Sequence, residues 1–167
     1  MAGNAAVQEL DGVWRITCPF AAGSQVMAYF IEAPQPAIID TGVRSSPRAV
    51  IGPALAATGL DLADTRFILN THGHWDHMGG NEALRGVASD AQVVAHQAEE
   101  RFFHDIAAHT RSYRDLVAEV PAFAALATAY TGQFADNIGL PTQVDVWLTA
   151  EQEIDLGGGI VLQAIHL

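Results

Sequence analysis

The chain contains 167 residues with a mass of 17.8 kDa, and half of them are apolar, which is enough for one domain with its own core. The net charge of −11 and the absence of any cluster among the eight basic residues exclude nucleic acid and anionic lipid surfaces as partners. No apolar run approaches the roughly 18 residues of a membrane span. We therefore expect one domain over residues 1–167 and no membrane contact.

The single cysteine, Cys18, excludes an internal disulfide. Residues 1–11 lack the positive charge and the continuous apolar stretch of a secretory signal, so we expect a cytoplasmic protein. Cys18 follows an apolar stretch and is interpreted as a small buried residue, with a catalytic thiol as the alternative.

The first third of the chain is predicted to be rich in β-strands. Short strands are expected at residues 13–17, 26–31 and 37–40, separated by turns that contain glycine, serine or proline. Ser46 and Pro47 then favour a helix start, with the serine hydroxyl capping free amides, and the helix is expected to bend at Pro53 and stop at Gly59.

The next segment alternates between strand and helix. The apolar run at residues 66–70 predicts a buried strand, and a cluster of histidines follows directly, so these side chains are expected on a loop at the carboxyl end of that strand. A brief helix is expected to start at Asn81 and end at Gly86, before another strand at residues 91–96.

Residues 97–140 are predicted to form a mostly helical insertion, with breaks at Pro121 and Gly132. Its scattered aromatic residues are interpreted as mostly core. A cover that excludes water from a site is the alternative, and it would imply an apolar or acyl-bearing substrate. Three final strands complete the expected order, with a tight connection at Gly157-Gly158-Gly159. They are placed at residues 147–149, 153–156 and 160–166.

The cluster His72-Gly73-His74-Trp75-Asp76-His77 places three imidazoles and a carboxylate in one short turn. With this composition, such a string arises by chance about once in a thousand chains. His72 and His74 are two residues apart and are expected to converge on one ion, while Asp76 and His77 address a second ion beside it. A polar turn whose histidines only form hydrogen bonds is the alternative.

Imidazole and carboxylate ligands without thiolate suit Zn²⁺, although Fe and Mn also accept them. A pair of such ions lowers the pKa of a bound water to about 7 and polarises the bond under attack, which is the chemistry of hydrolysis. The remaining histidines are interpreted as surface or core residues, with a lining position in the pocket as the alternative. They are His96, His104 and His109.

The segment Thr71–Gly80, with Ile38-Ile39-Asp40-Thr41-Gly42 upstream, resembles the motifs of the metallo-β-lactamase fold superfamily, which includes glyoxalase II, lactonases and class B lactamases. The resemblance implies an α/β fold, a four-layer αββα sandwich. It also implies that His72 and His74 bind the first metal and that Asp76 and His77 bind the second. Asp76 would in addition handle a proton during turnover.

The same resemblance implies that Asp40 supports the ligands by hydrogen bonding. Capping of the turn at Thr41-Gly42 is an equal alternative for this residue. The family pattern also needs a third histidine for the first metal, a bridging aspartate and a final histidine, none of which is visible. His166 falls a few residues short of the expected ligand position and is a weak candidate.

We therefore expect this chain to be the N-terminal part of a longer enzyme. Half of a two-sheet sandwich leaves an apolar face, so the prediction includes a homo-oligomer or association with the missing C-terminal part. The expected function is metal-dependent hydrolysis of an ester, thioester, lactone or amide of a small-molecule substrate, through metal-bound hydroxide. A non-haem iron enzyme resembling persulfide dioxygenases and a catalytically silent, metal-poor interaction module are the alternatives.

Overall fold

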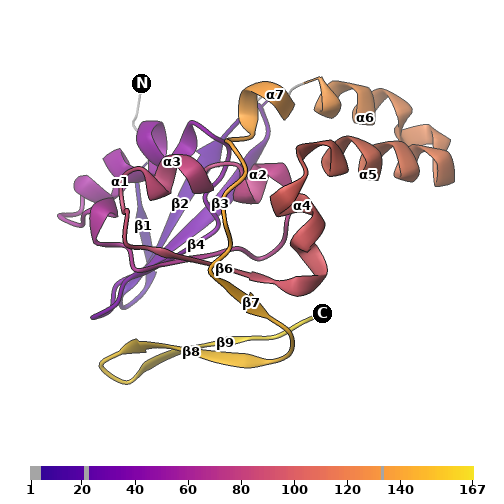
Figure 1. The fold of residues 1–167 in the computed structure, drawn as a ribbon. Coiled ribbons are helices and arrows are strands. Elements are labelled where there is room, and N and C mark those ends of the chain that lie inside the picture. The colour runs from indigo at the N-terminus through magenta and orange to yellow at the C-terminus, as the bar shows by residue number, and fades with distance from the viewer. Residues whose placement is uncertain (1–4, 21–22, 133) are drawn as a thin grey trace.

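The computed structural model describes residues 5–20, 23–132 and 134–167, and within them seven strands form one mixed sheet (Figure 1). Strands β1 to β4 pair antiparallel, whereas β4 to β7 pair parallel. In spatial order the strands are β1 (Val7–Leu10), β2 (Val13–Pro19), β3 (Gln25–Ile31), β4 (Ala37–Ile39), β5 (Phe67–Leu69), β6 (Gln92–His96) and β7 (Val146–Leu148). All but β1, which the sequence did not predict, match expected strands.

The register of the parallel strands positions the candidate site. Ile39 at the end of β4 pairs with Leu69 at the end of β5, and Leu69 pairs with Val94 of β6. Because parallel strands end at the same edge of a sheet, the residues that follow β4 and β5 are brought side by side there. Asp40 and the histidine cluster, which are more than thirty positions apart in sequence, are those residues.

One face of the sheet is covered by short helices (Figure 1). Fully buried residues such as Ile16, Ile38 and Ile68 pack there against Leu55 and Leu84. The expected helix after Ser46 is present, but its first part is a π-helical turn. These elements are η2 (Pro47–Ile51), α1 (Gly52–Ala56), η3 (Leu62–Asp64), α2 (Trp75–Met78) and α3 (Asn81–Arg85).

The predicted capping role of Ser46 is wrong. Its hydroxyl accepts a hydrogen bond from the backbone N–H of Val43, three residues upstream, at 3.1 Å, and makes no cap bond to the helix. The side chain closes the turn before η2, and Pro47 begins the helix without needing a donor there.

The opposite face of the large sheet carries an antiparallel hairpin of β8 (Gln152–Gly157) and β9 (Ile160–Ala164) (Figure 1). Leu156 of the hairpin is completely buried against Ile31, Leu69 and Val94 of the sheet. The predicted tight connection is confirmed, because Gly157, Gly158 and Gly159 all have positive φ angles. Helices, large sheet and hairpin thus form three successive layers, and the predicted α/β sandwich class is confirmed.

The helical insertion is confirmed as well, and α5 and α6 extend from the body as a helical hairpin (Figure 1). The breaks fall as predicted, with α5 ending before Pro121 and α6 ending before Gly132. Among the described residues, no helix is long and apolar enough to cross a membrane. The elements are η4 (Gln97–Glu99), α4 (Glu100–His104), α5 (Ile106–Glu119), η5 (Pro121–Phe123), α6 (Ala124–Thr131) and α7 (Phe134–Asn137).

Candidate metal centre

The histidine cluster occupies the loop after β5 and the first turn of α2. His74 is extended, with φ −70° and ψ 144°, and marks the point at which the loop becomes helix. Trp75 is 1% exposed and packs edge-on against Phe20, with ring centroids 5.3 Å apart. The buried tryptophan anchors the turn, so that the neighbouring polar side chains face outward from the core.

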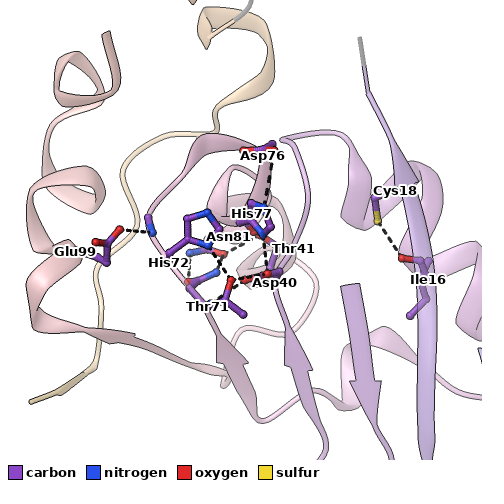
Figure 2. Close-up of polar contacts among 12 residues, drawn as sticks. Ile16, Cys18, Asp40, Thr41, Thr71, His72, Asp76, His77, Asn81 and Glu99 are labelled. Carbon is purple, nitrogen blue, oxygen red and sulfur yellow. Dashed lines mark hydrogen bonds and ion pairs between the residues drawn. The ribbon is translucent and has the colours of Figure 1, made fainter. Parts of the chain in front are cut away.

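The structure brings the four predicted ligand residues together. The ring centroid of His72 lies 4.6 Å from that of His74 and 4.1 Å from that of His77. The Nε2 atom of His77 is 3.9 Å from Oδ2 of Asp76 (Figure 2). The imidazoles therefore share one small volume rather than pointing apart.

No three His, Cys, Asp or Glu side chains in the described part of the chain are arranged to hold one ion. The four residues therefore offer at most two donors to any single position. The donor types fit Zn²⁺ and related cations, and two donors at one position would be fewer than the three or four protein ligands usual for zinc.

Asp40 connects the end of β4 to this loop. Its backbone adopts φ 59°, and its carboxylate is almost completely buried. Oδ1 accepts a hydrogen bond from Thr71 N–H at 2.9 Å, and Oδ2 lies 2.8 Å from Thr71 Oγ1 and 2.7 Å from His77 Nδ1 (Figure 2). These bonds run to the histidine loop rather than to the turn at Thr41-Gly42.

The bond from Asp40 fixes the orientation of the His77 ring. We assign the proton of the neutral imidazole to Nδ1, which donates to the carboxylate and leaves the lone pair of Nε2 for a cation. Burial lowers the pKa of His77, but the hydrogen bond and charge of Asp40, together with the charge of Asp76, outweigh it and raise the pKa overall.

His72 is linked to the same carboxylate through Thr71. Its Nδ1 atom lies 3.0 Å from Thr71 Oγ1, and that hydroxyl donates to Asp40. The arrangement again places the imidazole proton on Nδ1 and exposes Nε2. Burial, followed by the nearby charges of His77 and His74, lowers the pKa of His72 and favours the neutral form that binds metals.

A second polar network under the loop was missed in the sequence. Asn81 is completely buried. Its Oδ1 accepts a hydrogen bond from the Thr41 hydroxyl at 2.8 Å, and its Nδ2 donates one to Asn70 Oδ1 at 2.8 Å. The predicted start of the helix at Asn81 and its end at Gly86 are confirmed, because α3 spans Asn81–Arg85 and Gly86 is its C-cap, although the Asn81 side chain makes no cap bond. The sequence feature that could have indicated this network is that Thr41 and Asn70 each follow a predicted buried strand.

The helical insertion forms one wall of the centre. The rings of Phe102 and Tyr113 lie 6.0 and 6.5 Å from that of His74. Gly73 donates its N–H to Glu99 Oε2 at 2.8 Å (Figure 2). Glu99 carried no signal in the sequence, because it lies in a polar helical stretch 26 residues after the loop.

A cavity of about 510 Å³ lies beside His72, between the large sheet and the β8–β9 hairpin. His96 lies in it and accepts a hydrogen bond from Ala98 N–H through Nδ1. His166 stacks on His96, with centroids 4.0 Å apart, and also lines the cavity. Both histidines are therefore pocket-lining residues, the alternative interpretation for His96.

The other candidate residues adopt ordinary structural roles. His104 is half-exposed and pairs with Glu100 at 3.6 Å, while His109 is 1% exposed and bonds to the carbonyl of Phe102. Cys18 is buried in the core, and burial raises the pKa of its thiol to about 11. The interpretation of Cys18 as a small buried residue is confirmed.

Comparison with known proteins identifies a family whose model matches most of the chain. A family model described as the metallo-beta-lactamase superfamily matches residues 21–167. A curated protein, the cytoplasmic hydroxyacylglutathione hydrolase of Arabidopsis thaliana, is 38% identical over 50 residues, which are 27% of this chain and 19% of that protein.

Solved structures share the fold. A metallo-beta-lactamase of Cronobacter sakazakii with a HARLDQ motif has a TM-score of 0.70 at 22% identity, covering 96% of this chain and 54% of that one. BJP-1 of Bradyrhizobium japonicum, a subclass B3 enzyme, has a TM-score of 0.68 at 21% identity, with 98% and 52% covered. FEZ-1 of Legionella gormanii has a TM-score of 0.71 at 16% identity, with 98% and 53% covered. The chain spans about half the length of these structures.

Proposed function

The chain belongs to the metallo-β-lactamase superfamily, a family of metal-dependent hydrolases, and on this premise we propose that it supplies the first half of the ligand set of such an enzyme. The proposed reaction is hydrolysis of an ester, thioester, lactone or amide. The observation that carries the proposal is the convergence of three imidazoles and a carboxylate at the carboxyl end of β5, with the His77 ring oriented by Asp40.

In this proposal His72 and His74 hold the first ion, and Asp76 and His77 hold the second. Zn²⁺ is our preferred cation, and Fe and Mn are the alternatives for the same donors. The bound cations supply a water of lowered pKa and polarise the substrate carbonyl.

The residues of the chain contribute orientation and proton handling. Asp40 and Thr71 hold the imidazole protons on Nδ1 of His77 and His72, which directs both Nε2 atoms to the centre. The carboxylate of Asp76 is partly exposed and lies beside His77 Nε2, where it can accept a proton from an attacking water and return it to the leaving group.

We propose that the remaining donors come from outside these residues. The apolar cavity beside His72 and the hairpin face need a covering element, either further polypeptide of the same enzyme or a second copy of the chain. Light scattering of the 167-residue chain tests this point, because a stable, monodisperse monomer would contradict it.

The proposed substrate is a small molecule with an apolar or acyl-bearing portion. Support comes from the rings of Phe102 and Tyr113 beside His74, which offer an apolar surface next to the metal donors. The Arabidopsis relative is a cytoplasmic hydroxyacylglutathione hydrolase, so thioesters belong in the first substrate panel. We propose the cytoplasm as the compartment of this chain as well.

Metal analysis with a hydrolysis panel tests the proposed function. We expect the protein to bind divalent cations and to lose most of this binding in the double variant His72→Ala/His74→Ala. His104→Ala is the matched control, because that imidazole is half-exposed and contacts Glu100 and the Trp147 ring rather than the predicted ligand residues. Binding of a single iron with uptake of oxygen would refute the hydrolase and favour the persulfide dioxygenase-like alternative, whereas absence of any cation would favour the interaction module.

A further inference from the structure

Glu99 makes a contact that its own helix does not require. It directly precedes α4, yet its carboxylate forms no cap bond to that helix. The carboxylate instead accepts the backbone N–H of Gly73, between the two histidines proposed for the first ion (Figure 2). Because Oε2 of Glu99 already accepts this hydrogen bond at 2.8 Å, the geometry favours a hydrogen-bonding role for the carboxylate.

The glycine at position 73 is explained mainly by the close approach of Phe102, and in addition by the contact with Glu99. Its φ angle is not positive, so the backbone conformation alone does not require glycine. A Cβ atom there would lie 2.7 Å from Phe102 Cβ and 3.1 Å from Glu99 Oε2. Any side chain would therefore push α4 away and lengthen the bond to Glu99.

Within the insertion, α5 contacts Phe102 of α4, so the insertion can support the loop. His109 of α5 is 1% exposed, and its Nε2 atom lies 3.2 Å from the carbonyl oxygen of Phe102. The ring of Phe102 lies 5.0 Å from that of His109 and 6.0 Å from that of His74. A continuous set of contacts thus joins the interior of the insertion to the metal loop.

We propose that Glu99 is a positioning residue of the metal centre. By accepting the Gly73 N–H, its carboxylate fixes the turn between His72 and His74 and sets the spacing of the two rings for a cation. The helical insertion then controls the affinity of the first metal position as well as covering the site. The metal part of this inference rests on the proposed function, whereas the control of the loop does not.

The loop can be tested in the metal-free protein by comparing Glu99→Ala with Glu99→Gln. Glu100→Ala is the matched control, because Glu100 is adjacent and exposed, and its carboxylate pairs with His104 rather than with the loop. By NMR, we expect Glu99→Ala to accelerate amide exchange of Gly73 at least tenfold and to shift the imidazole resonances of His72 and His74. Glu99→Gln should stay close to wild type, because its side-chain oxygen still accepts the bond.

The amide of Ile68, in the buried strand β5, reports general destabilisation. Faster exchange at Gly73 alone supports the proposal. Equal acceleration at Gly73 and Ile68, or no acceleration at Gly73, overturns it. If Glu99→Ala does not fold, Glu99→Gln and Glu99→Asp provide the comparison, since the shorter aspartate should lengthen the bond and speed exchange at Gly73.

Titration with Zn²⁺ against a competing chelator tests the consequence for metal binding. We expect Glu99→Ala to weaken the affinity ten- to a hundredfold, the usual effect of removing a residue that supports a ligand. Glu99→Gln should lose less than about threefold, and Glu100→Ala nothing. Equal affinity in Glu99→Ala and Glu100→Ala would overturn the inference while leaving the proposed function intact. A wild-type chain that binds no cation would instead refute the proposed function. The amide exchange rate of Gly73 would still decide the role of Glu99 in the loop.

Discussion

Replacement of Asp40 should affect stability and metal binding together, because one buried carboxylate serves both. Asp40 is 3% exposed and accepts hydrogen bonds from Thr71 N–H, the Thr71 hydroxyl and His77 Nδ1–H. Asp40→Asn keeps the shape and one acceptor oxygen, and asparagine tolerates the positive φ of 59°. Asp40→Ala removes every acceptor and also places a Cβ-bearing residue with no compensating side chain in the left-handed region.

The magnitudes follow from these contacts. A buried donor left without its charged acceptor costs about 1–3 kcal/mol, and Asp40→Ala leaves several such donors. The cost of about 1–2 kcal/mol for a non-glycine residue in the left-handed region is largely present already in wild type, because Asp40 also carries a Cβ atom. We expect Asp40→Asn to lower the free energy of unfolding by about 1–2 kcal/mol and Asp40→Ala by about 3–5 kcal/mol. Because His77 and His72 lose their common orienting group, affinity for Zn²⁺ should fall ten- to a hundredfold in both variants.

The pKa of His77 supplies a third readout. Its folded value is raised, so this residue stabilises the metal-free fold fully below its ordinary pKa of about 6.5, and that contribution is lost as pH rises through the folded value. The destabilisation caused by Asp40→Asn should therefore be larger at pH 6 than at pH 9, and NMR titration should show a lower His77 pKa in the variant.

Urea denaturation and chelator competition measure the first two effects, with the exposed Asp64→Asn as the control. Wild-type stability and wild-type affinity in Asp40→Ala would refute the orienting role. Loss of stability with unchanged affinity would restrict Asp40 to holding the loop.

Three further predictions rest on burial and close contact. Because the pKa of Cys18 is about 11, its thiol should resist alkylation at pH 8 in the folded protein and react at the ordinary rate in urea, and fast labelling of the native chain would contradict its burial. Gly80→Ala should destabilise the fold by about 1–3 kcal/mol, because its Cβ would lie 2.4 Å from Thr41 O, whereas Gly132→Ala has only ordinary contacts and should stay near wild type in the same thermal melts. Burial lowers the pKa of His109, so the stabilisation by its neutral imidazole is complete above about pH 6.5 and is lost as pH falls through the folded pKa. His109→Gln should therefore reduce the loss of unfolding free energy at acidic pH. An unchanged dependence of that free energy on pH would rule out His109 as the source of the loss.

Strands and helices were predictable where local pattern and burial agree. The apolar runs at 26–31, 66–70 and 91–96 became buried strands because each is short, continuous and bounded by turn residues. The histidine cluster could be placed at a strand end for the same reason. β1 was not predictable in this way, since all four of its residues are exposed.

Polar residues were harder to interpret because residue type alone does not identify their hydrogen-bond partners. Ser46 and Asn81 have residue types that favour helix caps, yet their side chains bond elsewhere. The partner of Ser46 is the nearby Val43 N–H, in the turn before the helix, whereas the partner of Asn81 is the Thr41 hydroxyl, forty residues away. The two alternatives for Asp40 were equal in the sequence for the same reason, because only the pairing of β4 with β5 brings Thr71 within reach.

The parallel pairing of β4 with β5 also explains how this chain organises the residues that we propose as metal ligands. The pairing delivers Asp40 to the base of the histidine loop, and Asp40 with Thr71 then selects the imidazole tautomers before any cation arrives. Glu99 and Phe102 support the loop from the opposite side. Orientation of the His72 and His77 rings is thus determined by residues within this chain, whereas no three potential ligands among the described residues are arranged for one ion. Added donors should therefore raise cation affinity without rearranging His72 or His77, and a change in either tautomer on completion of the site would contradict this division.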